Sequence, residues 1–157
     1  MSRARIALAA ALLASAAGAE GRDETYSAGD QQIWIEYIDP IEIMWVGPNL
    51  YERTQVLSGD DIEIETFATD DLGVGLLGVP AVVTRMHATH SCETGTPLAY
   101  HVITLGPLLA TDGPLTTCVE LVVSVTNDMI LLEEDPMRQS GEDGEAWVWR
   151  PGEGFSQ

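Results

Sequence analysis

Three histidines, His87, His90 and His101, are the only ones in the chain, and they lie within fifteen residues of one another. The same segment contains a thioether at Met86 and a thiol at Cys92. A neutral imidazole nitrogen is a ligand for copper and zinc, and a thioether is a ligand for Cu(I). One hypothesis is therefore a copper or zinc site formed by His87, His90 and His101.

The expected local structure weakens this hypothesis. On a strand, His87 and His90 point to opposite faces, so they converge only if the chain turns before Ser91. His101 shares a strand face with the apolar Ala99, and a buried histidine with a hydrogen bond is the common outcome at such a position. We therefore expect no bound cofactor, and metal binding is kept as an alternative.

A hydrolase with an acidic cleft is a second alternative, because glycoside hydrolysis needs two carboxyl groups flanking the scissile bond. The candidate carboxylates lie in one segment: Asp60, Asp61, Glu63 and Glu65. Glu63 and Glu65 alternate there with Ile62 and Ile64, as in a strand that buries one face and exposes the other. The alternation favours a solvated strand face. The chain also lacks a Gly-x-Ser-x-Gly nucleophile motif, so an enzyme is the less favoured interpretation.

Trp147 and Trp149 lie two residues apart and share one face of a predicted strand. Such a pair can form a platform that stacks on a sugar or a peptide, which makes both residues ligand-binding candidates. The alternative is that the two rings complete the core or cover a sheet edge.

The elements that would position these residues are short strands. Apolar and β-branched runs recur between Gly, Pro, Asp and Asn, and no amphipathic helix is apparent after the first nineteen residues. This pattern predicts an all-β fold, a small antiparallel β-sandwich or barrel. Turns are expected at Asp112 to Pro114 and at Asn127 and Asp128, and the conformation of 72–80 is left open. The predicted strands are 32–38, 41–46, 54–57, 61–67, 81–88, 98–105, 119–125, 129–133 and 146–150.

The first nineteen residues have the pattern of a cleavable signal peptide. Arg3 and Arg5 precede an apolar run over 6–18, and Ala17 and Ala19 supply an Ala-x-Ala cleavage site. The run is shorter than the roughly 20 residues that span a bilayer, so we expect no membrane insertion after cleavage. The expected organisation is a signal peptide over 1–19 and a single β-rich domain over 20–157, located in the periplasm or secreted.

Both cysteines, Cys92 and Cys118, lie in the expected mature chain, so one intramolecular pairing is possible. An oxidising compartment favours a disulfide between them. Such a bond removes Cys92 both as a metal ligand and as a nucleophile activated by His90 or His101.

The charge of the chain excludes one class of partner. Removing the leader with Arg3 and Arg5 leaves five arginines against 25 acidic residues, a formal charge of −20. Nucleic acids and anionic lipid surfaces bind through basic patches, so a nucleic-acid partner is not expected. The expected partner is therefore an unknown envelope protein or a small ligand.

Three segments after Ser91 carry a resemblance: SCETGTPLAYHVITLG, TTCVEL and WVWRPGEGF. In this order, a cysteine loop, a strand with a tyrosine, a second cysteine before an acidic residue and Leu, and a terminal aromatic strand resemble small exported two-cysteine bacterial proteins of unknown function. The resemblance implies a disulfide and brings no activity with it. The sequence thus predicts an exported β-rich protein, a non-catalytic binding or accessory module.

Overall fold

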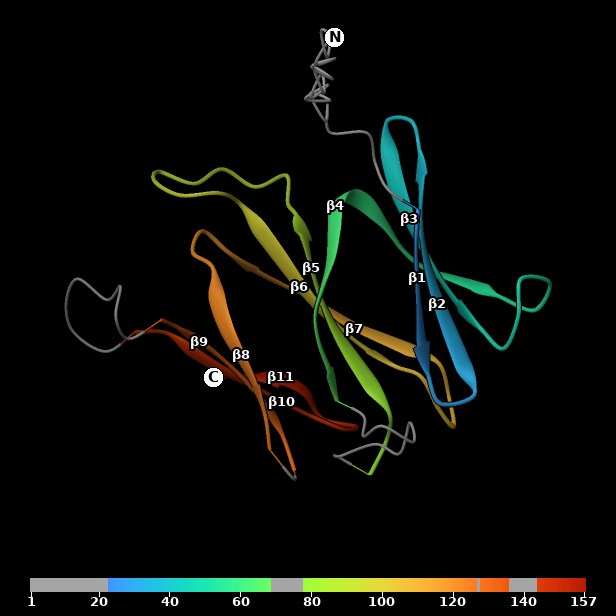
Figure 1. Cartoon of the computed structure of the whole chain (residues 1–157). Helices are drawn as coiled ribbons and strands as arrows, with labels where there is room; N and C mark the ends of the chain where they lie inside the picture. The colour runs from blue at the N-terminus through green and yellow to red at the C-terminus, as the bar shows by residue number, and fades with distance from the viewer. Residues whose placement is uncertain (1–22, 69–77, 127, 136–143) are drawn as a thin grey trace, which may run out of the picture.

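The computed structural model describes residues 23–68, 78–126, 128–135 and 144–157, and this part of the chain is all-β (Figure 1). The expected signal peptide and most of the segment 72–80 lie outside the described residues. Within the described ranges there is no helix that could cross a lipid bilayer. The strands are β1 (Glu24–Ala28), β2 (Gln31–Ile38), β3 (Ile41–Gly47), β4 (Thr54–Ala68), β5 (Ala81–His87), β6 (Leu98–Thr104), β7 (Ala110–Thr117), β8 (Leu121–Val125), β9 (Ile130–Glu134), β10 (Ala146–Arg150) and β11 (Gly154–Ser156).

The strands form two antiparallel sheets in which each strand pairs with its neighbours in sequence. One sheet has seven strands in the order β1 to β7, and the other has four in the order β11-β10-β9-β8. Short connections of this kind are typical of antiparallel meanders. The predicted fold class, an antiparallel all-β structure, is confirmed.

The long strand β4 bends the seven-stranded sheet over on itself. Its first part pairs with β3 and its second part, from Asp60 onward, pairs with β5. Register shifts follow Asp60 and Ile64, and Asp61 has a φ of 57°. Bulges of this kind bend a strand and increase its twist. The two strands expected over 54–57 and 61–67 are therefore one strand, with an irregular stretch between its two parts.

The bend places β5 and β6 in the middle of three layers (Figure 1). On one face of these strands, Val83 and Tyr100 belong to a core cluster shared with β8, β9 and β10. On the other face, Val82 and Ile103 belong to a second cluster shared with β1, β2 and β3. Because both faces are covered, β5 is buried over its first four residues and β6 over its first six.

The two cysteines form the predicted disulfide. Cys92, in the loop between β5 and β6, is bonded to Cys118 at the end of β7, and no cysteine is free. Bonded cysteines are typical of proteins outside the reducing cytoplasm, so the bond indicates a non-cytoplasmic fate. Nearby, the backbone N–H of Leu121 donates to the Tyr100 hydroxyl at 2.9 Å, which links β8 to the central strands.

Three strands differ from the sequence-based expectation. β1 precedes the first predicted strand, 32–38, and forms because Tyr26 and Ala28 pack in the second core cluster. β7 runs through the expected turn at Asp112 to Pro114, where a register shift against β6 accommodates Gly113. A Cβ atom at Gly113 would lie 2.8 Å from the Tyr100 carbonyl oxygen, so glycine permits this close approach. β11 lies beyond 146–150, the last predicted strand, and pairs with it.

The predicted hairpin between β8 and β9 is confirmed by the pairing of Val125 with Ile130. The backbone N–H of Thr126 donates to the Met129 carbonyl at 2.9 Å and closes the connection. Asn127 itself lies outside the described residues.

Candidate functional site

The three histidines line one cavity, which we call the histidine cavity. It has a volume of about 290 Å³ and lies beside the first half of β4, the end of β5, the first half of β6 and the second half of β7. Its lining includes His87, His90, His101, Met86, Leu57 and Pro114. The chain turns after β5, so His87 at the end of the strand and His90 in the following loop border the same cavity.

The spacing of the imidazoles is wider than that of a preformed metal site. Among the described residues, the one group of three potential His, Cys or carboxylate ligands within 4.8 Å of one another is His90, Cys92 and Cys118. His87, His90 and His101 do not form such a group. A metal ion bound by all three histidines would therefore require their side chains to move, and that site stays a prediction.

His101 is buried, with 8% of its surface exposed, and no hydrogen-bond partner within the described structure reaches its Nδ1 atom. Thr84 lies directly opposite on β5, and its buried hydroxyl also lacks a partner there. Desolvation by burial lowers the pKa of His101 below its ordinary value. His101 is thus a neutral, buried imidazole near pH 7, and its Nδ1 atom lacks a hydrogen-bond partner among the described residues.

This burial predicts a pH-dependent stability. Below about pH 6.5 the unfolded histidine takes up a proton that the folded one resists, so the unfolded state binds more protons. The free energy of unfolding should fall as the pH drops from 7 to 5, by at most about 1.4 kcal/mol per pH unit from this group. In His101→Gln the decline should be smaller, as measured by urea unfolding at pH 7, 6 and 5.

The raised carboxyl pKa values of Glu42 and Glu65, both due first to desolvation, act in the opposite direction. Both glutamates are present in the wild type and in His101→Gln, so the difference between the two pH dependences reports on His101. Equal slopes for the wild type and the variant would contradict the prediction.

A larger cavity lies beside the disulfide, and we call it the acidic cavity. Its volume is about 390 Å³. Met86, Leu98 and Val119 provide apolar lining, and Cys118 of the disulfide is part of the wall. The acidic lining residues are Asp61, Glu120, Glu134 and Asp135, and Arg85 and His87 complete the polar lining.

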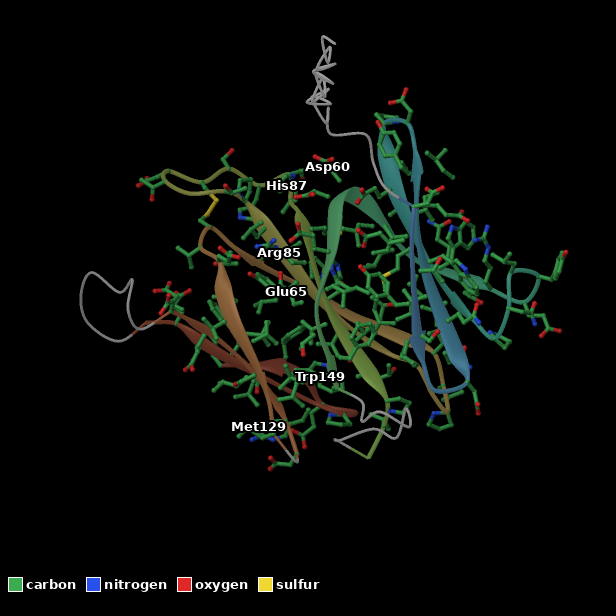
Figure 2. All side chains as sticks on the ribbon, viewed as in Figure 1. Asp60, Glu65, Arg85, His87, Met129 and Trp149 are labelled. Carbon is green, nitrogen blue, oxygen red and sulfur yellow. A yellow bond between two sulfur atoms is a disulfide. The ribbon has the colours of Figure 1, made fainter. Side chains whose placement is uncertain are left out.

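Arg85 of β5 is held by three carboxylates. Its guanidinium donates to Glu63, lies 3.0 Å from Glu65 and lies 2.7 Å from Glu120 (Figure 2). Burial alone would lower the pKa of Arg85, but the hydrogen bond to Glu63 and the charges of the three glutamates raise it above its ordinary value. The arginine therefore stays charged, and three carboxylates outweigh its charge.

The acidic face of β4 was expected to be solvated, but it is partly covered. The side chain of Glu65 is 21% exposed and that of Glu63 is 49% exposed. Glu63 lies directly opposite Arg85 in the register of β4 and β5, a relation that the sequence alone does not reveal. Of the four carboxylates considered for a hydrolase, Asp61 is the one in the described lining of the acidic cavity.

His87 lies between Asp60 and Asp61, two members of that carboxylate set. Its Nδ1 atom is 3.3 Å from Asp60, and its Nε2 atom is 3.4 Å from Asp61 (Figure 2). Both partners sit at the irregular stretch of β4, so the bulge sets this contact. His87 thus borders both cavities from the end of β5.

Trp147 and Trp149 lie in the core cluster between the central strands and the four-stranded sheet, with 7% and 0% of their surfaces exposed. Their rings pack against other side chains instead of being presented at the surface. The indole N–H of Trp149 donates to Asp112 of β7 at 2.8 Å, so this residue joins the two sheets.

No protein-family model, curated protein or solved structure matches this chain. The assignment of a function therefore depends on the two cavities themselves. Their most informative residues were missed in the sequence: Arg85, Glu120, Glu134 and Asp135. The sequence did show an excess of acidic residues, but composition alone does not predict which of them line a cavity.

Proposed function

We propose that this protein is an exported, non-catalytic module that binds a small organic cation in the acidic cavity. Export is supported by the pattern of the first nineteen residues and by the disulfide. The observation that carries the ligand class is the lining, which contains four carboxylates and one arginine. That arginine is bound by Glu120 of the lining and by Glu63 and Glu65 outside it, so the lining keeps a net negative charge.

The shape and chemistry of the cavity favour an amine on an aliphatic body. A volume of about 390 Å³ lies in the range of small-molecule sites. The ammonium group would lie among Asp61, Glu134 and Asp135, where charge-assisted hydrogen bonds are stronger than neutral ones. The methylene groups would contact the apolar wall, including Leu98 and Val119. An aliphatic diamine satisfies both requirements.

The test compares cadaverine with 1,5-pentanediol, its neutral isostere, by isothermal titration calorimetry on the oxidised protein. We expect cadaverine to bind and pentanediol not to bind detectably. The double variant Glu134→Gln with Asp135→Asn should weaken cadaverine binding about tenfold, or about 1.4 kcal/mol, because it removes two carboxylates from the lining.

Glu153→Gln provides the matched control. Glu153 is an exposed carboxylate in the turn between β10 and β11 and is not part of the cavity lining. It should change the affinity little, because it lies outside the lining and salt screens exposed charges. Equal binding of the diol, or an equal loss in Glu153→Gln, would reject a localised cation site.

Copper or zinc binding through His87, His90 and His101 is the second candidate. It is supported by the shared histidine cavity, where Met86 adds a thioether to the lining. The spacing of the three imidazoles weakens it. Stoichiometric metal retained by the oxidised protein would favour this candidate over the organic cation.

A further inference from the structure

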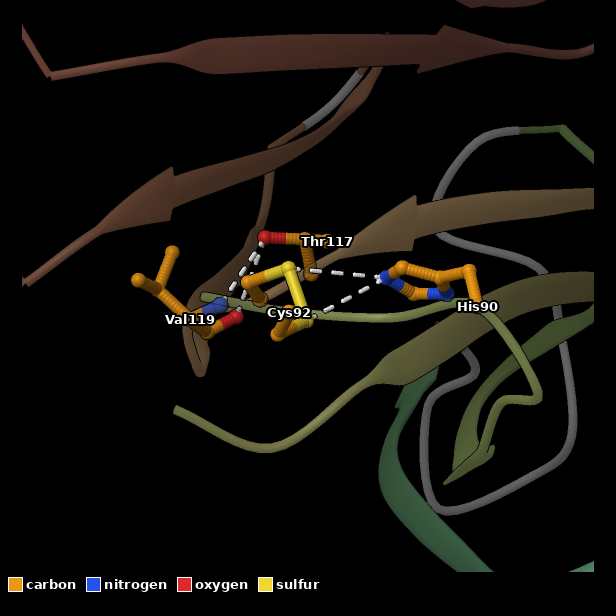
Figure 3. The surroundings of a disulfide bond; sticks show 5 residues. His90, Cys92, Thr117 and Val119 are labelled. Atoms are coloured by element: carbon orange, nitrogen blue, oxygen red, sulfur yellow. Dashed lines mark hydrogen bonds between the residues drawn. A yellow bond between two sulfur atoms is a disulfide. The ribbon is translucent and has the colours of Figure 1, made fainter. Parts of the chain in front are cut away.

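The disulfide lies against a histidine (Figure 3). His90 Nε2 is 3.6 Å from the sulfur of Cys92 and 3.6 Å from the sulfur of Cys118. In the described part of the chain, these two sulfurs are the hydrogen-bond partners found for Nε2. We propose that reduction of the Cys92–Cys118 bond creates a zinc site formed by His90 Nε2 and the two cysteine sulfurs.

The distances agree with tetrahedral zinc. Zinc binds thiolate sulfur at about 2.3 Å and imidazole nitrogen at about 2.0 to 2.1 Å, which places nitrogen and sulfur about 3.6 Å apart. Both nitrogen–sulfur separations therefore already match the site. Reduction has to open one remaining edge, from a bonded sulfur pair to about 3.8 Å. Rotation about the two Cα–Cβ bonds supplies this movement, while the Cα atoms stay near their separation of 5.6 Å.

The backbone around the three ligands is held by contacts other than the disulfide. The Ala88 N–H donates to the Pro97 carbonyl at 2.9 Å and closes the base of the loop that carries His90 and Cys92. At Gly95, a Cβ atom would lie 2.1 Å from the Cys118 carbonyl oxygen, so this glycine lets the loop pack directly on Cys118. Neither contact involves the sulfur atoms, so the loop is expected to keep its conformation after the disulfide is reduced.

The segment after β7 is restrained in the same way. The Thr117 hydroxyl donates to the Val119 carbonyl at 3.2 Å and accepts from the Val119 N–H at 3.1 Å (Figure 3). These contacts bracket Cys118 on both sides. Preorganised ligands bind a metal with less loss of conformational entropy than ligands on a disordered chain.

The chemistry balances with a dithiol as the reductant. The dithiol gives two electrons and two protons to the disulfide, is itself oxidised to a disulfide, and leaves two thiols on the protein. Zinc then binds two thiolates and releases the two protons, while neutral His90 contributes the lone pair of Nε2. A water molecule takes the fourth position, as in three-ligand zinc sites. Zinc binding is thus gated by the redox state and does not depend on the organic-cation proposal.

The test uses the mature chain in three forms: oxidised wild type, reduced wild type and reduced His90→Ala. Each is freed of reductant without oxygen and titrated with Zn²⁺ against a chromophoric chelator. Reduced wild type should bind one equivalent, and the oxidised protein should bind none at this position. His90→Ala should weaken binding at least about tenfold, because one of three protein ligands is lost.

Ser91→Ala is the matched control, because Ser91 is exposed and lies between the two loop ligands. It should bind zinc like the wild type. Co²⁺ in place of Zn²⁺ should give the intense d–d bands of a tetrahedral site and a thiolate charge-transfer band, both altered in His90→Ala. Circular dichroism follows the fold in every form.

Three results would overturn the proposal: zinc affinity that is equal in reduced wild type and His90→Ala, equal binding by the oxidised protein, and a reduced chain that unfolds and does not refold with zinc. Equal binding by the oxidised protein would assign the zinc site to the histidine cavity instead. Failure of cadaverine binding leaves this result unaffected, so the two proposals fail separately.

Discussion

Replacing Trp149 with alanine is expected to lower the free energy of unfolding by about 3 to 5 kcal/mol, the range for a large aromatic residue in a core. Trp149 is fully buried between the two sheets, and its indole N–H donates to Asp112 (Figure 2). The substitution removes the apolar contacts and the hydrogen bond together. A domain of this size has a total stability of about 5 to 15 kcal/mol, so the loss is large.

Urea unfolding followed by circular dichroism measures this effect without depending on the tryptophan signal. Trp149→Phe is the control, because it keeps most of the ring and removes the donor to Asp112. Its cost should be smaller, about 1 to 3 kcal/mol for an acceptor left without its donor. An alanine variant as stable as the wild type would mean that the contact between the sheets contributes little.

The second large effect is expected from removing the disulfide with Cys92→Ser and Cys118→Ser together. The bond closes a loop with a sequence separation of 26 residues. The chain-entropy model gives such a closure about 3 to 4 kcal/mol of stability, through the restriction of the unfolded chain. The same variant loosens the wall of the acidic cavity, so cadaverine binding should weaken as well.

Urea unfolding of the double variant and of wild type reduced in the presence of a chelator should give the same midpoint, below that of the oxidised protein. The chelator is needed because zinc would stabilise the reduced wild type through the site proposed above. A double variant as stable as the oxidised wild type would show that the loop and Cys118 are held by their other contacts alone.

The strands that the sequence predicted are those with a strong local signal. β2, β3, β5 and β6 are rich in apolar and β-branched residues, and each was predicted at nearly its observed bounds. β7 was missed because its sequence, ATDGPLTT, looks like a turn. Its extended form comes from pairing with β6, and Gly113 is required there by the close approach of Tyr100. No local pattern contains that information.

The candidate sites, like the strands, were predictable only where the signal is local. The disulfide was predictable because two cysteines allow one pairing. The partners of Arg85 were not, because they come from β4 and from the link between β7 and β8. Their meeting depends on the register of β4 against β5 and on the docking of the second sheet. The histidines were recognised as a group, but the bend of β4 decides which space they border.

The order of the strands gives the protein two separable halves. The seven-stranded sheet ends at Thr117 and the four-stranded sheet begins at Leu121, so one backbone cut at Val119 would leave each sheet whole on its own fragment. Cys92 and Cys118 would stay on the same fragment and could not tether the other. Reassembly would depend on the apolar seam around Trp149 and on bonds such as that from Leu121 to Tyr100. Two fragments produced by such a cut are therefore expected to reassemble, and the affinity between them would measure the strength of the interface between the sheets.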